Sequence, residues 1–221
     1  MSRTQRDLKA LRQQQREEAQ RRQRAKDRRN LLLIGAALAV AGIAIFLTAA
    51  FLNHQQNPSG SGHLAFKAYT GNLPGIQMPD EGTATHIDPS TTWSYKSYPP
   101  TSGPHYGAPD GPASWQTDTP MREGTFLHNM EHGGIAIVYD CASGSACTTL
   151  KNQLDNYVQN LVPADPQFNE YKMVMTPYAR GMTHKVGLLA WHYVEWLDGY
   201  DQAAITRFYE AHVDQGPEHI A

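Results

Sequence analysis

Two histidines four residues apart form the clearest chemical motif in this sequence. They are His128 and His132, the ends of the string His-Asn-Met-Glu-His. Residues four apart share a face of a helix, and residues at even separation share a face of a strand, so both rings can reach one metal ion in either structure. Glu131 joins that face only if the segment is helical. Met130 adds a thioether, a soft ligand suited to Cu(I), although it would also serve as an apolar core residue.

A third histidine lies in a segment that prolines make stiff. The string YPPTSGPHY runs from Tyr98 to Tyr106 and contains His105. Proline fixes one backbone angle, so such a loop can hold a side chain at low entropic cost. Together with His128 and His132, it predicts a set of three imidazoles, which suits copper or zinc. The alternative is that the histidines only bond to the backbone and order the loops.

The same string also fits a catalytic pattern. In inverted zinc peptidases, the two histidines of H-x-x-E-H bind zinc and the glutamate is the general base. That pattern requires a helix, whereas Gly133-Gly134 and the strand-like sequence IAIVY follow directly. We therefore interpret residues 128–132 as a turn that enters a strand. A zinc hydrolase with Glu131 as base remains an alternative to metal binding without catalysis.

Four sequence motifs in this order resemble a known family. They are PPTSGPHY, LHNMEHGG before a strand, Ala190-Trp191, and Gly216-Pro217-Glu218 after a helix. The segment from Tyr95 to Glu218 resembles the bacterial and archaeal domain-of-unknown-function family three-one-zero-five. The resemblance implies no activity. It implies that the family's signature positions are His105, His128, Glu131, His132 and Gly133, and that the layout includes a basic amino terminus and one membrane anchor.

An uncharged apolar run from Leu31 to Leu52 predicts a transmembrane helix. A helix of this length crosses a hydrocarbon core of roughly 30 Å. Residues 1–30 hold eleven Lys/Arg and four Asp/Glu, a net charge of +7. Such a basic segment stays in the cytoplasm, so we expect a single-pass protein of the cell membrane with its carboxyl-terminal domain outside. A cleavable signal peptide is the alternative, but the apolar run exceeds the usual signal core of about 7–15 residues.

The rest of the chain has the opposite charge. Residues 53–221 carry eight Lys/Arg and seventeen Asp/Glu, a net charge of −9, which argues against nucleic acid as a partner. Residues 53–63 have the composition of a flexible linker. The two cysteines, Cys141 and Cys147, are predicted to form a disulfide in an oxidising compartment, closing a short loop of small residues.

Residues 64–221 are predicted to form one extracytoplasmic α+β domain. Apolar periodicity predicts strands at 134–139, 171–177 and 185–197 and helices at 148–161 and 201–213. A segment rich in Gly, Pro, Ser and Thr precedes them and predicts long loops. We therefore expect a mostly antiparallel sheet with two helices packed on it.

These observations favour a membrane-anchored extracytoplasmic protein that binds copper, or else zinc, through its histidines. The first alternative is the zinc-dependent hydrolase. The second is a non-catalytic assembly or scaffold protein of the cell envelope, whose partners are the lipid bilayer and other envelope membrane proteins. A non-enzymatic role is preferred, because the sequence identifies no substrate site.

Overall fold

The computed structural model describes residues 62–220 of the 221-residue chain. The predicted basic arm and membrane span, and nearly all of the predicted linker, lie outside the described residues. Across residues 62–220, none of the helices has both the length and the apolar character needed to cross a bilayer.

The described residues form an α+β domain around one five-stranded sheet. Its strands, in spatial order, are β1 (Ile76–Gln77), β7 (Tyr193–Leu197), β6 (Val186–Ala190), β4 (Ile135–Tyr139) and β5 (Met173–Pro177). Every neighbouring pair is antiparallel except β4 and β5, so the predicted, mostly antiparallel sheet is confirmed. A separate parallel ribbon pairs β2 (His86–Ile87) with β3 (His105–Tyr106).

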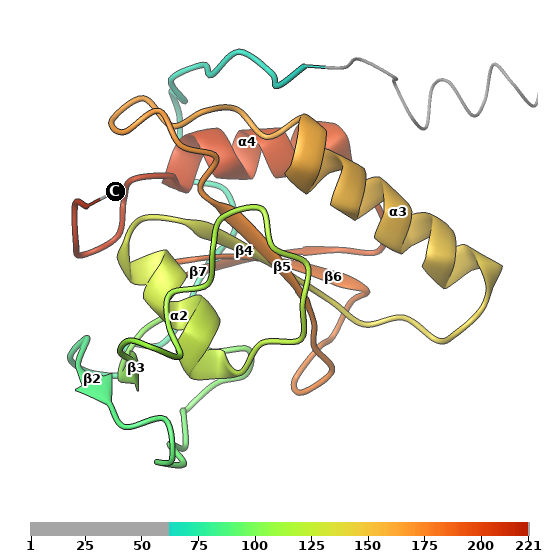
Figure 1. Cartoon of the computed structure of the whole chain (residues 1–221). Helices are drawn as coiled ribbons and strands as arrows, with labels where there is room; N and C mark the ends of the chain where they lie inside the picture. The colour runs from blue at the N-terminus through green and yellow to red at the C-terminus, as the bar shows by residue number, and fades with distance from the viewer. Residues whose placement is uncertain (1–61, 221) are drawn as a thin grey trace, which may run out of the picture. The chain divides into compact units, whose positions relative to one another are not determined.

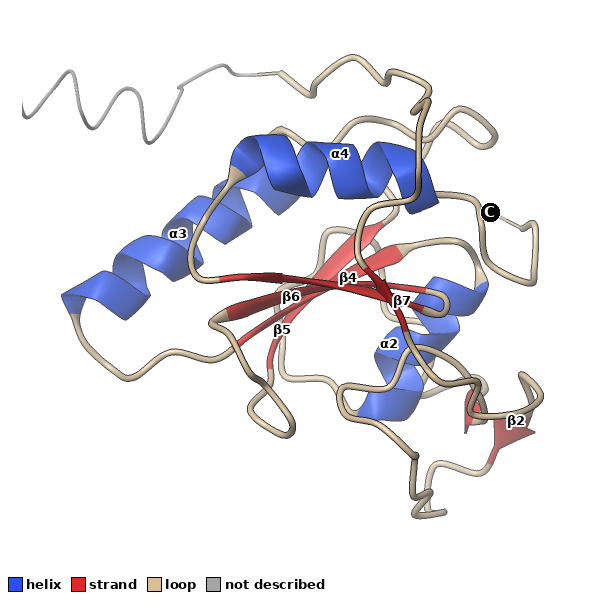
Figure 2. Ribbon diagram, turned by 180° about the vertical axis from the view of Figure 1, so that it is seen from behind, coloured by secondary structure: helices blue, strands red, loops and turns tan. Residues whose placement is uncertain are grey.

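Helices cover both faces of the sheet (Figures 1 and 2). Helices α3 (Ser145–Asn160) and α4 (Gln202–His212) lie on one face, and α2 (Glu123–Glu131) lies on the other. Alternate residues of a strand point to opposite faces. Ile135 and Ile137 accordingly join the apolar cluster beneath α3 and α4, whereas Ala136 and Val138 join the cluster beneath α2. Helix α2 is thereby fixed on the sheet by its apolar side, which leaves its other side for the polar residues.

The expectation of two helices, and of a turn at residues 128–132, was wrong. The described residues contain three helices, and α2 includes most of that motif, with His132 as its C-terminal cap. Gly133 has a φ of +78°, the left-handed conformation in which glycine commonly ends helices. The two glycines therefore mark the end of a helix that lies immediately before β4, rather than a turn in place of a helix.

The prediction of one strand from Lys185 to Leu197 was also wrong. The segment is a hairpin, in which β6 and β7 pair along their full lengths. Trp191 and His192 form the two-residue connection, and His192 has a φ of +66°. Two-residue hairpin turns usually contain glycine, asparagine or aspartate. Because Trp-His is not such a signal, the apolar pattern runs through the turn without a visible break.

Cys141 lies just after β4, and Cys147 lies in the first turn of α3. The structure joins Cys141 to Cys147 with a Cα–Cα distance of 5.4 Å, as the sequence predicts. The bond closes the loop between β4 and α3.

Candidate metal centre

Three short elements bring polar side chains together on the side of α2 that faces away from the sheet. Helix α2 contributes His128 and Glu131 from its last turn, and His105 comes from β3. Strand β2 contributes His86, which lies directly opposite His105 in the parallel ribbon. The ribbon approaches α2 closely, since a Cβ added to Gly124 would lie 2.5 Å from the Tyr106 ring. This close packing sets the distance between the histidines of the ribbon and those of the helix.

The donor atoms of these four residues form one group. Their ligand atoms all lie within 4.8 Å of one another. The Oε2 atom of Glu131 lies 2.7 Å from Nε2 of His105, 3.5 Å from Nε2 of His86 and 4.0 Å from Nε2 of His128. Three imidazoles and a carboxylate converging in this way can hold a metal ion.

Backbone carbonyls fix which ring nitrogen carries the proton in two of the histidines. His105 Nδ1 lies 2.9 Å from the Gly103 carbonyl, and His128 Nδ1 lies 2.6 Å from the Tyr106 carbonyl. A carbonyl only accepts hydrogen bonds, so Nδ1 is the donor in both rings. In the neutral ring, the lone pair of Nε2 then faces the cluster. Metal-binding histidines in proteins almost always have such a bond on their second nitrogen.

The contact between His105 and Glu131 requires a proton or a metal ion between the two residues. When Nδ1 holds the only ring proton and the carboxyl is ionised, Nε2 of His105 and Oε2 of Glu131 present lone pairs to each other at 2.7 Å. Either a proton carried by one of the two groups or a metal ion must occupy the space between them. Both residues are buried, so water does not screen this contact.

His132 also points toward His128. The two Nε2 atoms lie 3.1 Å apart, a distance that allows one ring to donate to the other. Burial lowers the pKa of His128 below its usual value and lowers that of His132 to about 4, and repulsion from neighbouring histidines adds to both shifts. Both rings are therefore neutral at physiological pH, which is the form that binds metals.

The structure divides the three predicted histidines between two overlapping groups. His105 and His128 belong to the first, whereas His132 belongs to a second group with Glu131 and Glu218. Nε2 of His132 lies 3.5 Å from Oε2 of Glu218. Glu131, predicted only as an additional ligand, is the residue common to both groups.

Met130 has a different environment from its neighbours in the motif. It is fully buried in the apolar cluster between α2 and the sheet, which it shares with Phe126 and Leu127. This packing accounts for its burial without a ligand role.

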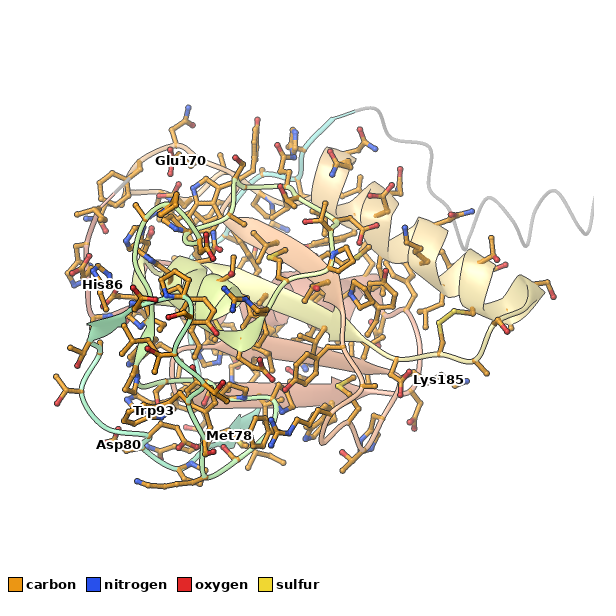
Figure 3. The ribbon with its side chains drawn as sticks, turned by 60° about the horizontal axis from the view of Figure 1, so that its bottom comes forward. Met78, Asp80, His86, Trp93, Glu170 and Lys185 are labelled. Atoms are coloured by element: carbon orange, nitrogen blue, oxygen red, sulfur yellow. A yellow bond between two sulfur atoms is a disulfide. The ribbon has the colours of Figure 1, made fainter. Side chains whose placement is uncertain are left out.

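Sequence reasoning missed His86 and Glu218 as site residues. No local motif surrounds His86, because what brings it to the centre is its pairing with a strand about twenty residues away. Glu218 belongs to a motif noted for its resemblance, but nothing in its spacing connects it to α2. The first group is exposed to solvent at His86, whose side chain is 53% exposed. Figure 3 shows this residue at the edge of the molecule.

Comparison with known families agrees with the resemblance. Residues 86–221 match the model of the family described as Protein of unknown function (DUF3105). No curated protein and no solved structure matches the chain significantly. The match includes every residue of both donor groups and well over half of the sequence. The chain belongs to this family.

Proposed function

We propose that this protein is a single-pass membrane protein whose extracytoplasmic domain binds a divalent first-row metal ion. The ligands are Nε2 of His86, His105 and His128 together with the carboxylate of Glu131. The proposal of an anchor rests on the sequence alone, on the apolar run at residues 31–52 and the basic arm before it. The proposal of metal binding rests on geometry.

One observation carries the metal proposal. His105 and His128 each donate Nδ1–H to a backbone carbonyl, and both therefore direct Nε2 lone pairs toward the same buried carboxylate. A solitary buried histidine needs only one hydrogen-bond partner for each nitrogen. In His105 and His128, Nδ1 already has a carbonyl as its partner. Their Nε2 atoms are acceptors that face the acceptor oxygens of the carboxylate, and a bound cation would remove this conflict.

The donor set favours Cu²⁺ first and Zn²⁺ second. Imidazole nitrogen suits both ions, and at a given site of nitrogen and oxygen donors Cu²⁺ binds more tightly than Zn²⁺. Cu(I) is favoured by soft sulfur ligands, and the thioether of the motif, Met130, packs in the apolar cluster. The proposed role is therefore the binding of oxidised copper at the cell envelope.

Titration of the full-length protein with Cu²⁺ and Zn²⁺ tests this proposal. We expect tight binding by the native chain. His105→Ala and His128→Ala should each weaken affinity by at least about 100-fold, since even the loss of a supporting partner commonly costs 10–100-fold. His184→Ala is the control, because its ring stacks on Trp196 near Lys185, which Figure 3 shows on the opposite side from His86. Equal affinity in all four proteins would contradict the proposal.

The helical conformation of the motif supports a second candidate function. The objection to a zinc hydrolase was the absence of a helix, yet α2 continues through Glu131 and the Nε2 atoms of His128 and His132 lie 3.1 Å apart. In this alternative, those two imidazoles bind zinc and Glu131 serves as the general base. The two imidazoles and the carboxylate of the H-x-x-E-H pattern therefore lie together at the end of one helix, which supports this alternative.

Hydrolysis assays at saturating zinc distinguish the two functions. A hydrolase should cleave peptide or ester substrates, and Glu131→Gln should slow cleavage by roughly 10²–10⁴-fold while zinc remains bound. Measured zinc content must accompany each rate, because Glu131 also borders the ion. If the fully zinc-loaded native protein cleaves no substrate, the hydrolase alternative is wrong and the proposal of metal binding without catalysis stands.

A further inference from the structure

The second donor group lies directly beside the first. It consists of Glu131, His132 and Glu218, whose ligand atoms again lie within 4.8 Å of one another. The two groups share Glu131 alone. His132 and Glu218 do not join the first group at this distance, so with Glu131 they form a second, adjacent set of donors.

The first ion would leave His132 without its present partner. His132 is buried, and its Nε2 now faces Nε2 of His128 at 3.1 Å. Once His128 gives its lone pair to a metal ion, it can no longer accept a hydrogen bond from His132. The carboxylate of Glu218 lies 3.5 Å from Nε2 of His132, and a carboxylate oxygen of Glu131 lies within 4.8 Å of it. A buried imidazole with two carboxylates nearby has the composition of a second cation site.

The carboxyl-terminal segment is fixed in the place that this site requires. The backbone N–H of Glu218 donates to the carbonyl of Glu131 at 3.0 Å. Fully buried Lys172 donates to the carbonyls of His132 and Ile220, at 3.2 and 3.0 Å, and to Asp214 at 3.0 Å. These bonds tie the end of α2 to the segment that carries Glu218. The carboxylate of Glu218 therefore reaches His132 from a backbone that is already ordered.

We propose that the protein binds a second metal ion through His132, Glu218 and the shared carboxylate of Glu131, an inference that rests on the proposed function of the first group. Glu131 has two oxygens and stands between the groups, so it can bridge the pair. Protein sites that hold two ions about 3.5–4 Å apart clamp an oxygen-containing ligand between them. The centre is accordingly suited to small oxyanions or to a bridging hydroxide.

Metal content per chain tests the second site in the full-length protein. Loaded with Cu²⁺ and freed of excess ion, the native chain should retain two ions and Glu218→Gln should retain one. Glutamine preserves the size of the side chain and the backbone bond to Glu131. His219→Ala, on the exposed neighbouring residue, is the matched control and should retain two.

Electron paramagnetic resonance of the copper-loaded native protein gives an independent readout. Two ions bridged by Glu131 should show an exchange-coupled spectrum, and Glu218→Gln should show the spectrum of an isolated Cu²⁺ ion. One ion in the native chain, unchanged in Glu218→Gln, would overturn the second site and leave the first intact. Two ions in both proteins, or two uncoupled ions in the native chain, would also overturn it. No bound ion would overturn the proposed function itself.

Discussion

His132 connects the chemistry of the site to the stability of the metal-free protein. Its pKa is lowered to about 4, chiefly because it is buried. The unfolded chain, with an ordinary histidine pKa near 6.5, therefore binds more protons than the native state between about pH 6.5 and 4. Stability rises with pH wherever the unfolded state binds more protons. The stabilising effect of neutral His132 is thus complete above pH 6.5 and is lost as the pH falls toward 4.

We therefore predict that the metal-free protein loses stability on acidification from pH 7 to 4.5. His132 should account for roughly 1–3 kcal/mol of the free energy of unfolding. Urea unfolding followed by tryptophan fluorescence measures this change. His132→Asn should reduce the pH dependence without abolishing it, because burial also lowers the pKa of His128 and of His212. An unchanged pH dependence in His132→Asn would contradict this assignment.

Glu81 organises the loop that presents His105. Its buried carboxylate accepts the backbone N–H of Lys96 at 2.6 Å and that of Ser97 at 2.9 Å. Gly103, with a φ of +98°, packs against it, since an added Cβ there would lie 2.6 Å from the Glu81 Cβ. The carbonyl of the same glycine holds Nδ1 of His105. Glu81 therefore supports the candidate metal centre without belonging to it.

Glu81→Ala should destabilise the protein by roughly 2–3 kcal/mol, because it leaves backbone donors without their acceptor. It should also weaken metal affinity by about 10-fold, the lower end for loss of a supporting group. Urea unfolding of the metal-free protein and Cu²⁺ titration measure the two effects. Asp80→Asn is the control, since Asp80 is exposed and its side chain accepts the backbone N–H of Gly82 at 2.9 Å. Similar effects in both variants would argue against the supporting role.

At the residue scale, local sequence identifies the ligands that lie within motifs and misses those brought in by long-range pairing. His105 and His128 stand in recognisable strings, but the four-residue spacing pairs His128 with His132, which the structure places in the second group. His86 reaches the same point only through the register of β2 on β3. The positions of Glu81 and Glu218 depend on how loops pack, and no periodic pattern in the sequence indicates that packing.

The end of α2 and the carboxyl-terminal segment form one packed unit. A Cβ added to Gly216 would collide with the carbonyl of Glu131 and with the backbone nitrogen of Gly133. Gly133 itself approaches Asp214, where an added Cβ would lie 2.6 Å from the Asp214 Cα. Only glycines permit this approach of the two backbones. Gly133 therefore has a structural role beyond ending the helix.

Gly216→Ala should displace the segment and destabilise the protein by about 1–3 kcal/mol, the usual cost of overpacking. Because the displacement moves Glu218, the variant should also bind one Cu²⁺ ion fewer than the native chain. Gly199→Ala serves as the control, since a Cβ there meets nothing within 4 Å. Thermal unfolding and metal analysis provide the two measurements. Native stability in Gly216→Ala would show that the segment adjusts freely.

Elements with strong apolar periodicity could be predicted from the sequence. Elements whose boundaries the sequence signals poorly could not. Helices α3 and α4 follow from apolar residues spaced along one face, and β4 follows from its β-branched run. The sequence did not predict helix α2, because the helix is short and glycines follow it immediately. It did not predict the β6–β7 hairpin, because the turn contains no glycine or asparagine. In both cases the misleading signal lay at an element boundary.

At the scale of the whole molecule, the charge distribution favours a chain oriented across a membrane. The first thirty residues carry a net charge of +7 and residues 53–221 a net charge of −9. A basic segment before an apolar run predicts retention of the amino terminus in the cytoplasm. Both groups of metal ligands follow the predicted span, so the proposed topology places them outside the cell.

Protease treatment of intact cells tests this orientation. Epitope tags at the two ends should behave differently, with the amino-terminal tag protected and the carboxyl-terminal tag lost. Permeabilised cells provide the control, in which both tags become accessible. Protection of the carboxyl-terminal tag in intact cells would reverse the topology. Release of the domain as a soluble protein would instead indicate cleavage after the apolar run.

The most direct test of the metal centre is a crystal structure of the protein loaded with Cu²⁺, recorded with anomalous diffraction at the copper edge. We predict a strong peak about 2 Å from Nε2 of both His105 and His128, since copper–imidazole bonds are close in length to the zinc–nitrogen bonds of about 2.0–2.1 Å. Peaks confined to exposed histidines such as His184, with none between α2 and the β2–β3 ribbon, would contradict it.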